Sequence, residues 1–103
     1  MVNTVRLTTQ TVNVIKAIVN RPGGVSGAEI SRDTELASGS LYPILMRLEK
    51  AGWLSSEWEA GDPAKLGRPR RRYYRVTALG QREVNAVRDA LAPTFGEAAW
   101  TAS

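Results

Sequence analysis

The apolar residues of this chain change their spacing once, at Gly52, and that change limits the folds that the chain can adopt. Before Gly52, four apolar residues lie three or four positions apart, which places them on one narrow face of an α-helix. After Gly52, residues 53–59 alternate in part between apolar and polar side chains, and residues 72–76 are rich in Tyr and Val, as is typical of β-strands. The sequence therefore predicts helices followed by a β-hairpin. The four helical residues are Leu41, Ile44, Leu45 and Leu48.

Two shorter helices are predicted before this one. Residues 8–20 carry apolar side chains at near-helical spacing and begin with threonines that can cap the first turn. Residues 27–33 follow Ser26, and Glu29 lies three positions after it, which is the pattern of a capping box. The connection to the next helix, residues 34–37, has the length seen between two helices that meet at a steep angle. We therefore expect a helix-turn-helix unit.

Prolines limit the third and the last helix. We expect the third helix to begin near Ser40, because Pro43 then falls in the first turn, where a missing N–H has no intrahelical partner. We expect it to end at Gly52. The last helix is predicted over residues 78–92, and its apolar seam is expected to be interrupted at Pro93.

The composition restricts the chain to one domain and argues against an enzyme. With 103 residues, the chain has room for a single modest core. It contains no cysteine and no histidine, which removes the commonest metal ligands and the commonest general base. The sequence also lacks a nucleophile-elbow motif and a glycine-rich phosphate loop. We therefore expect no catalytic residue, no metal site and no cofactor.

The charge and the hydropathy of the chain indicate its partners. The net charge of +4 and a pI of about 10.0 favour a polyanionic partner. No apolar run approaches the roughly 18 residues that span a bilayer. Residues 1–10 also lack the apolar stretch of a secretory signal. We therefore expect a cytoplasmic protein with no membrane partner.

These elements define the expected fold class, which is mainly α with a small β-hairpin. The arrangement is a winged helix-turn-helix with a three-helix core, a two-stranded wing and a C-terminal helix. We expect residues 1–77 to form the DNA-binding domain, and the C-terminal helix and tail, residues 78–103, to dimerise.

The outward face of the third helix is the first candidate site. In this fold, the third helix fits the major groove of double-stranded DNA, where its side chains read base edges. An ordinary solvated helix face is the alternative. The candidate residues are Ser38, Gly39, Ser40, Tyr42, Pro43 and Arg47.

The second candidate site is the wing, the loop over residues 60–69 with the strand that follows. Six cations lie within residues 65–75 with no acidic residue among them, and like charges repel unless an anion faces them. Arginine suits forked contacts with phosphate and insertion into a narrow minor groove. A solubilising surface or an acidic partner is the alternative. The candidate DNA contacts are Lys65, Arg68, Arg70, Arg71 and Arg72, and the sixth cation is Arg75.

Five further residues have a structural and a functional interpretation. Ser26 and Gly27 open a helix whose free N–H groups could bind a DNA phosphate, or they could form only a cap. Trp53 and Trp58 are expected to fill the core beside the hairpin, and stacking on a ligand is the alternative. Trp100 lies beyond the last helix, and we expect it to pack at a subunit interface or to line a ligand pocket.

Several short motifs lie between residues 39 and 80. They are GSLYPIL (39–45), RLE (47–49), GWL (52–54), GRPRR (67–71), YYRVT (73–77) and Gly80. Together they resemble the PadR family of transcriptional regulators, and the resemblance covers most of residues 8–92. In it, Ser40 and Tyr42 match recognition-helix positions and residues 70–72 match the wing.

The resemblance implies a winged helix-turn-helix homodimer that represses a nearby operon, sometimes until a small aromatic or cationic effector binds. The short C-terminal helix resembles the compact subgroup of the family. The candidate dimerisation residues are Val84, Val87, Leu91, Phe95 and Trp100.

Two functions from different classes remain open. The first is a dimer that binds double-stranded DNA sequence-specifically, with two recognition helices about 34 Å apart on an inverted repeat. The second is a winged-helix interaction module that binds a protein or structured RNA. A protein that sequesters a ligand without a regulatory output is a third alternative.

Overall fold

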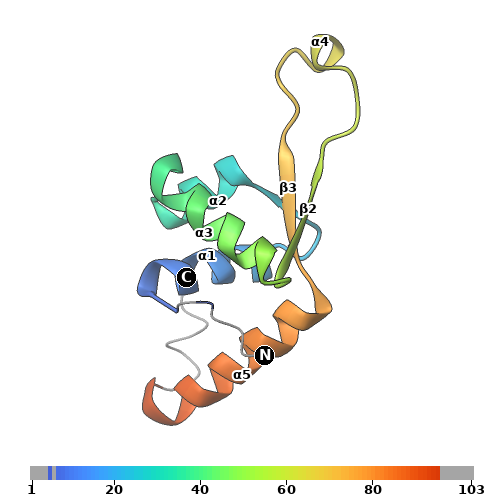
Figure 1. Cartoon of the computed structure of the whole chain (residues 1–103). Coiled ribbons are helices and arrows are strands. Elements are labelled where there is room, and N and C mark those ends of the chain that lie inside the picture. Colours follow the sequence, from blue (N-terminus) through green and yellow to red (C-terminus); the bar gives the residue numbers. More distant parts are fainter. Residues whose placement is uncertain (1–4, 6, 96–103) are drawn as a thin grey trace.

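The computed structural model describes residue 5 and residues 7–95 of the chain. Three helices form one body, a long hairpin projects from it on one side, and the last helix leaves it on the other (Figure 1). In chain order the elements are α1 (Thr9–Val19), β1 (Val25–Ser26), α2 (Gly27–Thr34), α3 (Ser38–Lys50), β2 (Leu54–Trp58), α4 (Pro63–Leu66), β3 (Arg72–Val76) and α5 (Ala78–Phe95).

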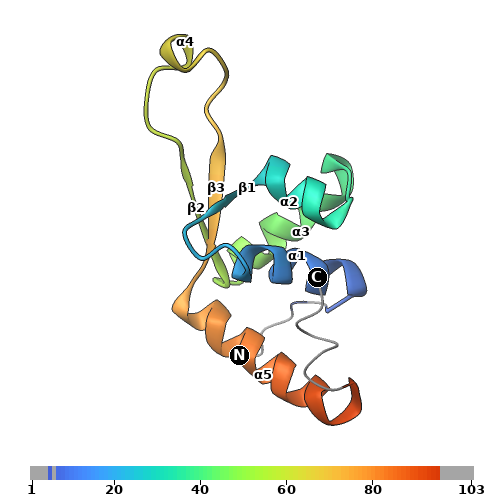
Figure 2. The same cartoon turned by 180° about the vertical axis from the view of Figure 1, so that it is seen from behind.

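The hairpin is part of a three-stranded antiparallel sheet with the order β1-β3-β2. The expected two-stranded wing therefore gains a third strand at its base, where Val25 pairs with Tyr74 and Ser26 with Tyr73. Figure 2 shows β1 lying beside β3 just before α2 begins. A strand of two residues is too short to give a readable alternation, which is why the sequence pattern missed it.

The core lies between the inner faces of α1, α2 and α3 and the base of the sheet. Its apolar side chains come from seven elements or their flanking residues, and burying each large one contributes about 1.5–3 kcal/mol. All four apolar residues of the predicted α3 face are among them. The core residues are Val14, Ile15, Ala17, Ile18, Val25, Ile30, Leu41, Ile44, Leu45, Leu48, Trp53, Leu54, Tyr74 and Val84.

Helix α3 begins at Ser38, so the start expected near Ser40 is wrong. The backbone N–H groups of Ser40 and Leu41 donate to the Ala37 carbonyl at 3.0 and 2.9 Å, which closes the first turn two residues earlier. Pro43 therefore lies inside the helix and cannot donate to the carbonyl of Gly39. Both residues are exposed, so water can bind the freed carbonyl oxygen and the missing bond does not end the helix.

Helix α5 continues through Pro93 to Phe95, so the expected interruption at Pro93 is also wrong. A proline inside a helix removes one backbone hydrogen bond, and so close to the end of the helix this loss leaves the preceding turns intact. No helix among the described residues, α5 included, has both the length and the apolar character that a membrane span requires.

A set of backbone contacts fixes the start of α5 against the base of β2. The Thr77 N–H donates to the Trp53 carbonyl at 2.9 Å, and the Thr77 hydroxyl donates to the Gly52 carbonyl at 2.5 Å. The Gly80 N–H donates back to the Thr77 hydroxyl at 3.0 Å. A side chain at Gly80 would collide with Trp53, whose carbonyl carbon would lie 2.9 Å from the added Cβ atom. The Thr-x-x-Gly motif is therefore a close contact between helix and strand.

Candidate nucleic-acid interface

The outward face of α3 is exposed along its length. Every residue proposed on this face is exposed, and the exposed fraction of Tyr42 is 44 %. Met46, one turn after Tyr42, is 67 % exposed and is the most exposed of the large apolar residues in the described part of the chain. The sequence placed Met46 on this face but did not single it out. The side chains free to meet a groove are therefore a mixture of hydroxyl, apolar and cationic groups.

The Tyr42 ring packs across the first residue of α2. A Cβ atom at Gly27 would lie 2.5 Å from the Tyr42 hydroxyl oxygen, so only a glycine leaves room for the ring. Gly27 itself is buried. The ring is therefore fixed against α2 while its outer edge stays open to solvent.

Ser26 forms a complete capping box at the start of α2. Its hydroxyl accepts from the Glu29 N–H at 3.2 Å, and its own N–H donates to the Glu29 carboxylate at 3.0 Å. This backbone donation lowers the pKa of Glu29. Ser26 is only 3 % exposed, and Gly27 lies under Tyr42. Groups of the protein thus occupy both positions, which argues against the phosphate contact expected there and favours the simple cap.

Three of the six wing cations face carboxylates of the same chain. Arg68 pairs with Glu59, Arg72 lies 3.5 Å from Glu49, and Arg75 pairs with Glu57. Part of the anionic charge expected to face these cations is therefore supplied by the chain itself, by Glu57 and Glu59 on the hairpin and by Glu49 on α3. Among the described residues, the wing cations outside any ion pair are Lys65, Arg70 and Arg71.

The Arg68–Glu59 pair closes the wing where the strands end. Both guanidinium nitrogens Nη1 and Nη2 donate to the two carboxylate oxygens, at 2.6 and 2.8 Å, and the Arg71 N–H adds a third bond at 3.2 Å. The side-chain hydrogen bonds from Arg68, with the one from the Arg71 N–H, lower the pKa of Glu59 to about 2. The loop beyond carries α4, capped by the Asp62 carboxylate. The wing is therefore an ordered element rather than a free loop.

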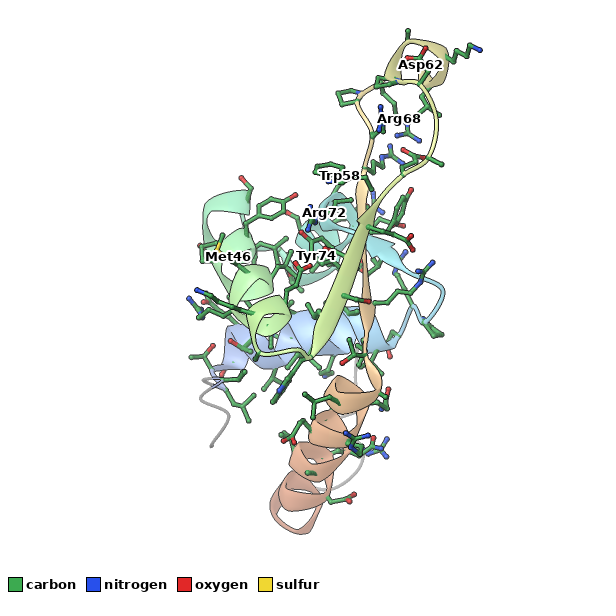
Figure 3. All side chains as sticks on the ribbon, turned by 45° about the vertical axis from the view of Figure 1, so that its right-hand side comes forward. Met46, Trp58, Asp62, Arg68, Arg72 and Tyr74 are labelled. Carbon is green, nitrogen blue, oxygen red and sulfur yellow. The ribbon has the colours of Figure 1, made fainter. Side chains whose placement is uncertain are left out.

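Arg72 connects the wing to α3. Its Nε donates to the Ser56 hydroxyl at 2.9 Å, and that hydroxyl donates to the Glu49 carboxylate at 2.6 Å. Its guanidinium also lies 5.3 Å from the centre of the Trp58 ring, within the range of a cation–π contact. Tyr74 follows on the same face and is buried, which raises its pKa. Figure 3 shows Trp58, Arg72 and Tyr74 following one another down the hairpin beside α3.

Trp58 is 59 % exposed, so its expected place in the core is wrong, whereas Trp53 is 4 % exposed and fills the core as predicted. Alternation places Trp58 on the same face of β2 as the buried Leu54, but it does not predict how far along that face α3 reaches, and the cover ends before Trp58. Arg75 lies on the opposite face of β3 from Arg72, as alternation along a strand requires, and donates to the Gly23 carbonyl at 3.3 Å as well as to Glu57.

The candidate dimerisation residues fall into three groups. Val84 is 3 % exposed and packs in the core of its own chain, so it is not available for a subunit interface. Val87 packs partly against the same core. The side chains of Leu91 and Phe95 lie outside the described part of the structure, although their backbone is helical, and Trp100 lies outside the described residues.

Within the described residues, no three acidic, histidine or cysteine side chains converge in a way that could hold a metal ion. A shallow hollow of about 600 Å³ lies between α1 and α2, and its lining combines Lys16 and Arg21 with Asp33 and Glu35. Such a mixed lining does not favour a polyanion. The exposed helix face and the free cations of the wing remain the groups best suited to DNA.

An exposed helix of a helix-turn-helix beside a basic two-stranded wing defines the class of winged-helix regulators. Residues 26–86, more than half of the chain, match the Transcriptional regulator PadR-like family. The chain belongs to this family, which confirms the resemblance seen in its motifs. No curated protein matches the chain.

Solved structures show the same fold. A PadR family transcription regulator from Clostridium difficile superposes with a TM-score of 0.68 at 19 % identity over 82 % of this chain and 88 % of that one. A PadR family regulator from Eggerthella lenta superposes with a TM-score of 0.63 at 26 % identity, over 78 % of this chain and 71 % of that one. BpsR of Bordetella bronchiseptica superposes with a TM-score of 0.68 at 14 % identity, over 99 % of this chain and 71 % of that one. The DNA binding of BpsR is regulated by 6-hydroxynicotinic acid. The predicted winged helix-turn-helix fold is confirmed.

Proposed function

We propose that this PadR-family regulator binds double-stranded DNA sequence-specifically through α3 and the wing. The observation that carries the proposal is the position of Lys65, Arg70 and Arg71, which lie outside every ion pair of the described residues, on a wing that projects beside α3 (Figure 1). With α3 in a major groove, the wing would reach the adjacent minor groove, where arginine binds well. Residues 1–77 would form this DNA-binding unit.

The proposed assembly is a homodimer formed by residues 78–103. The support is the position of α5, which leaves the body on the side away from the wing tip (Figure 2). Two recognition helices about 34 Å apart would then read an inverted repeat. The proposed output is repression in the cytoplasm, relieved by a small-molecule effector, as an effector regulates the DNA binding of BpsR.

The experiment selects preferred duplexes from a random pool with purified protein. A palindromic preferred site that survives competitor DNA supports specific binding by a dimer, because purely electrostatic binding does not survive competition. Equal affinity for the selected and unrelated duplexes would instead indicate purely electrostatic binding, and tighter binding of structured RNA than of any duplex would support the interaction module.

The wing is tested with charge reversals. Arg70→Glu and Arg71→Glu should each weaken binding of the selected duplex at least tenfold, since each replaces a free cation beside phosphates by an anion. The matched control is Arg32→Glu, which makes the same change in net charge at an exposed site on α2 that is not among the proposed DNA contacts. Binding by the wing variants as tight as that of the control would overturn the assignment of the wing.

A further inference from the structure

Trp58 has a position that neither the core nor the ion pairs of the wing explain. The register of β2 and β3 pairs Trp58 with Arg72 and Ser56 with Tyr74, so these four side chains share one face of the hairpin. Helix α3 covers the inner part of that face, where Tyr74 is 4 % exposed and Ser56 donates to Glu49. Trp58 is the next position outward and stands free at the corner between α3 and the wing (Figure 3).

The Trp58 ring is supported by a side chain of the neighbouring strand. Arg72 lies against it, 5.3 Å from its centre, and is itself fixed by Ser56 on β2 and Glu49 on α3. A chain of contacts thus leads from α3 to the indole. A large aromatic side chain kept 59 % exposed on such a support presents a rigid apolar surface with one N–H donor.

The chemistry around the ring points to one kind of occupant. On the side toward the wing tip, Trp58 shares a shallow hollow of about 520 Å³ with Pro63, Pro69 and Arg70, and its lining contains no carboxylate. Arg70 is exposed and outside every ion pair of the described residues. An apolar surface beside a free cation matches a sugar–phosphate strand, in which an apolar sugar alternates with an anion.

The proposed binding mode brings such a strand to this corner. If α3 lies in a major groove and the wing tip in the adjacent minor groove, the backbone strand that separates the two grooves must pass between them. We propose that Trp58 contacts this strand: its ring packs on a deoxyribose and its Nε1–H donates to a phosphate oxygen, while Arg72 and Glu49 position the ring. This inference rests on the proposed duplex binding and adds a contact to the backbone, which is independent of sequence.

The first test measures the affinities of wild type, Trp58→Phe and Trp58→Ala for the selected duplex and for an unrelated duplex. Trp58→Phe keeps an aromatic ring, although a smaller one, but loses the N–H, and a lost hydrogen bond to phosphate should weaken both complexes about tenfold. Trp58→Ala should weaken both further, with the ratio of the two affinities unchanged. Thermal unfolding checks that the variants fold, which an exposed position should allow.

The second test observes the indole directly in protein labelled with 5-fluorotryptophan. The Trp58 resonance, identified by its absence from Trp58→Phe, should shift on addition of duplex and lose its sensitivity to solvent deuterium. Wild-type affinity in Trp58→Ala, or a resonance unchanged at saturating duplex, overturns the contact and leaves the proposed function standing. A wild-type protein that binds no duplex overturns the proposed function, and this inference with it.

Discussion

Glu59 is an acidic residue on a surface that we propose faces phosphates, and its effect should be opposite to that expected from its charge. It accepts three hydrogen bonds from Arg68 and Arg71 and so holds the end of the wing closed. Glu59→Gln removes a negative charge, yet it should weaken duplex binding about three- to tenfold, because Arg68 loses a forked ionic partner. Fluorescence anisotropy with a labelled duplex measures the change.

The control for this prediction is Glu57→Gln. Glu57, on β2, is also paired with an arginine, but it is largely exposed, and no hydrogen bond or ion pair of the described residues joins it to Glu59, Arg68 or Arg71. Its substitution should leave affinity unchanged or raise it slightly. Tighter binding by both variants would show that charge alone matters and that the wing needs no internal closure.

The pKa of Glu59 gives a second test of the same pair. Hydrogen bonds from Arg68 lower it from 4.5 to about 2, so the folded state holds the carboxylate more strongly than the unfolded chain does. The pair therefore stabilises the fold fully above about pH 4.5, and this contribution is lost as the pH falls through about 2. A titration followed by the carboxyl ¹³C resonance should give Glu59 a midpoint at a pH of about 2. A midpoint near 4.5 would mean that the pair is absent in solution.

Glu35, in the turn between α2 and α3, has a left-handed backbone with a φ of 59°. Its Cβ atom makes this conformation costly, by about 1–2 kcal/mol, and a glycine avoids that cost. Glu35→Gly should therefore raise the free energy of unfolding by about 0.5–1 kcal/mol, after the added flexibility of the unfolded chain is subtracted. Urea unfolding measures this, and Glu35→Ala, which keeps the Cβ atom, should show no gain.

At this scale, the sequence predicted which residues are cationic but not which of them are free. Arg68, Arg72 and Arg75 pair with glutamates that lie 9, 23 and 18 positions away. The Arg68 and Arg75 pairs depend on the register of β2 and β3, which a thirteen-residue connection does not fix, and the Arg72 pair depends on how α3 packs on the hairpin. Trp58 was misplaced for the same reason, since its surroundings are set by the hairpin and α3 together.

At the scale of the elements, the tightest contact joins the start of α5 to the end of the α3–β2 connection. Gly80→Ala would place a Cβ atom within 2.9 Å of the Trp53 carbonyl carbon, so backbone would have to move against backbone. The helix would be displaced and the Thr77–Trp53 bond strained. We expect the free energy of unfolding to fall by about 2–3 kcal/mol.

The matched control for Gly80→Ala is Gly39→Ala in α3. No atom lies within 4 Å of a Cβ atom added there. Alanine should therefore stabilise the helix by up to about 1 kcal/mol through its propensity alone. If both substitutions changed stability equally in urea unfolding, the close contact at Gly80 would be absent.

Within the described part of the chain, local rules located every helix except α4 but misjudged the effects of Pro43 and Pro93. A proline inside a helix costs one hydrogen bond, and whether the helix ends there depends on what replaces that bond. At Pro43 the freed carbonyl is exposed to water, and the packed Leu41, Ile44 and Leu45 hold the turn in place. The boundaries were therefore set by packing, which a local pattern does not contain.

At the scale of the whole molecule, the order of elements was sufficient to predict the architecture. Three amphipathic helices can bury their apolar faces only against one another, and a hairpin that follows must cover the open side of that core. The same argument does not extend to the far end of α5. Val84 packs into the core of its own chain, whereas the other candidate dimerisation residues of the helix lie further along it. Dimerisation therefore remains a proposal.

The salt dependence of DNA binding should distinguish free cations from paired ones. Each phosphate contact releases counterions and contributes about −0.9 to the slope of log K against log salt concentration. Arg71 is exposed and outside any ion pair, whereas Arg75 is held by Glu57 and the Gly23 carbonyl on the other side of the sheet from α3. In a dimer, Arg71→Gln should therefore make the slope less negative by about 2, one contact for each protomer. Arg75→Gln removes the same charge and should leave the slope unchanged. Equal changes in the two variants, measured by anisotropy from low to high potassium chloride, would mean that DNA responds to the total charge of the wing and not to the arrangement of its arginines.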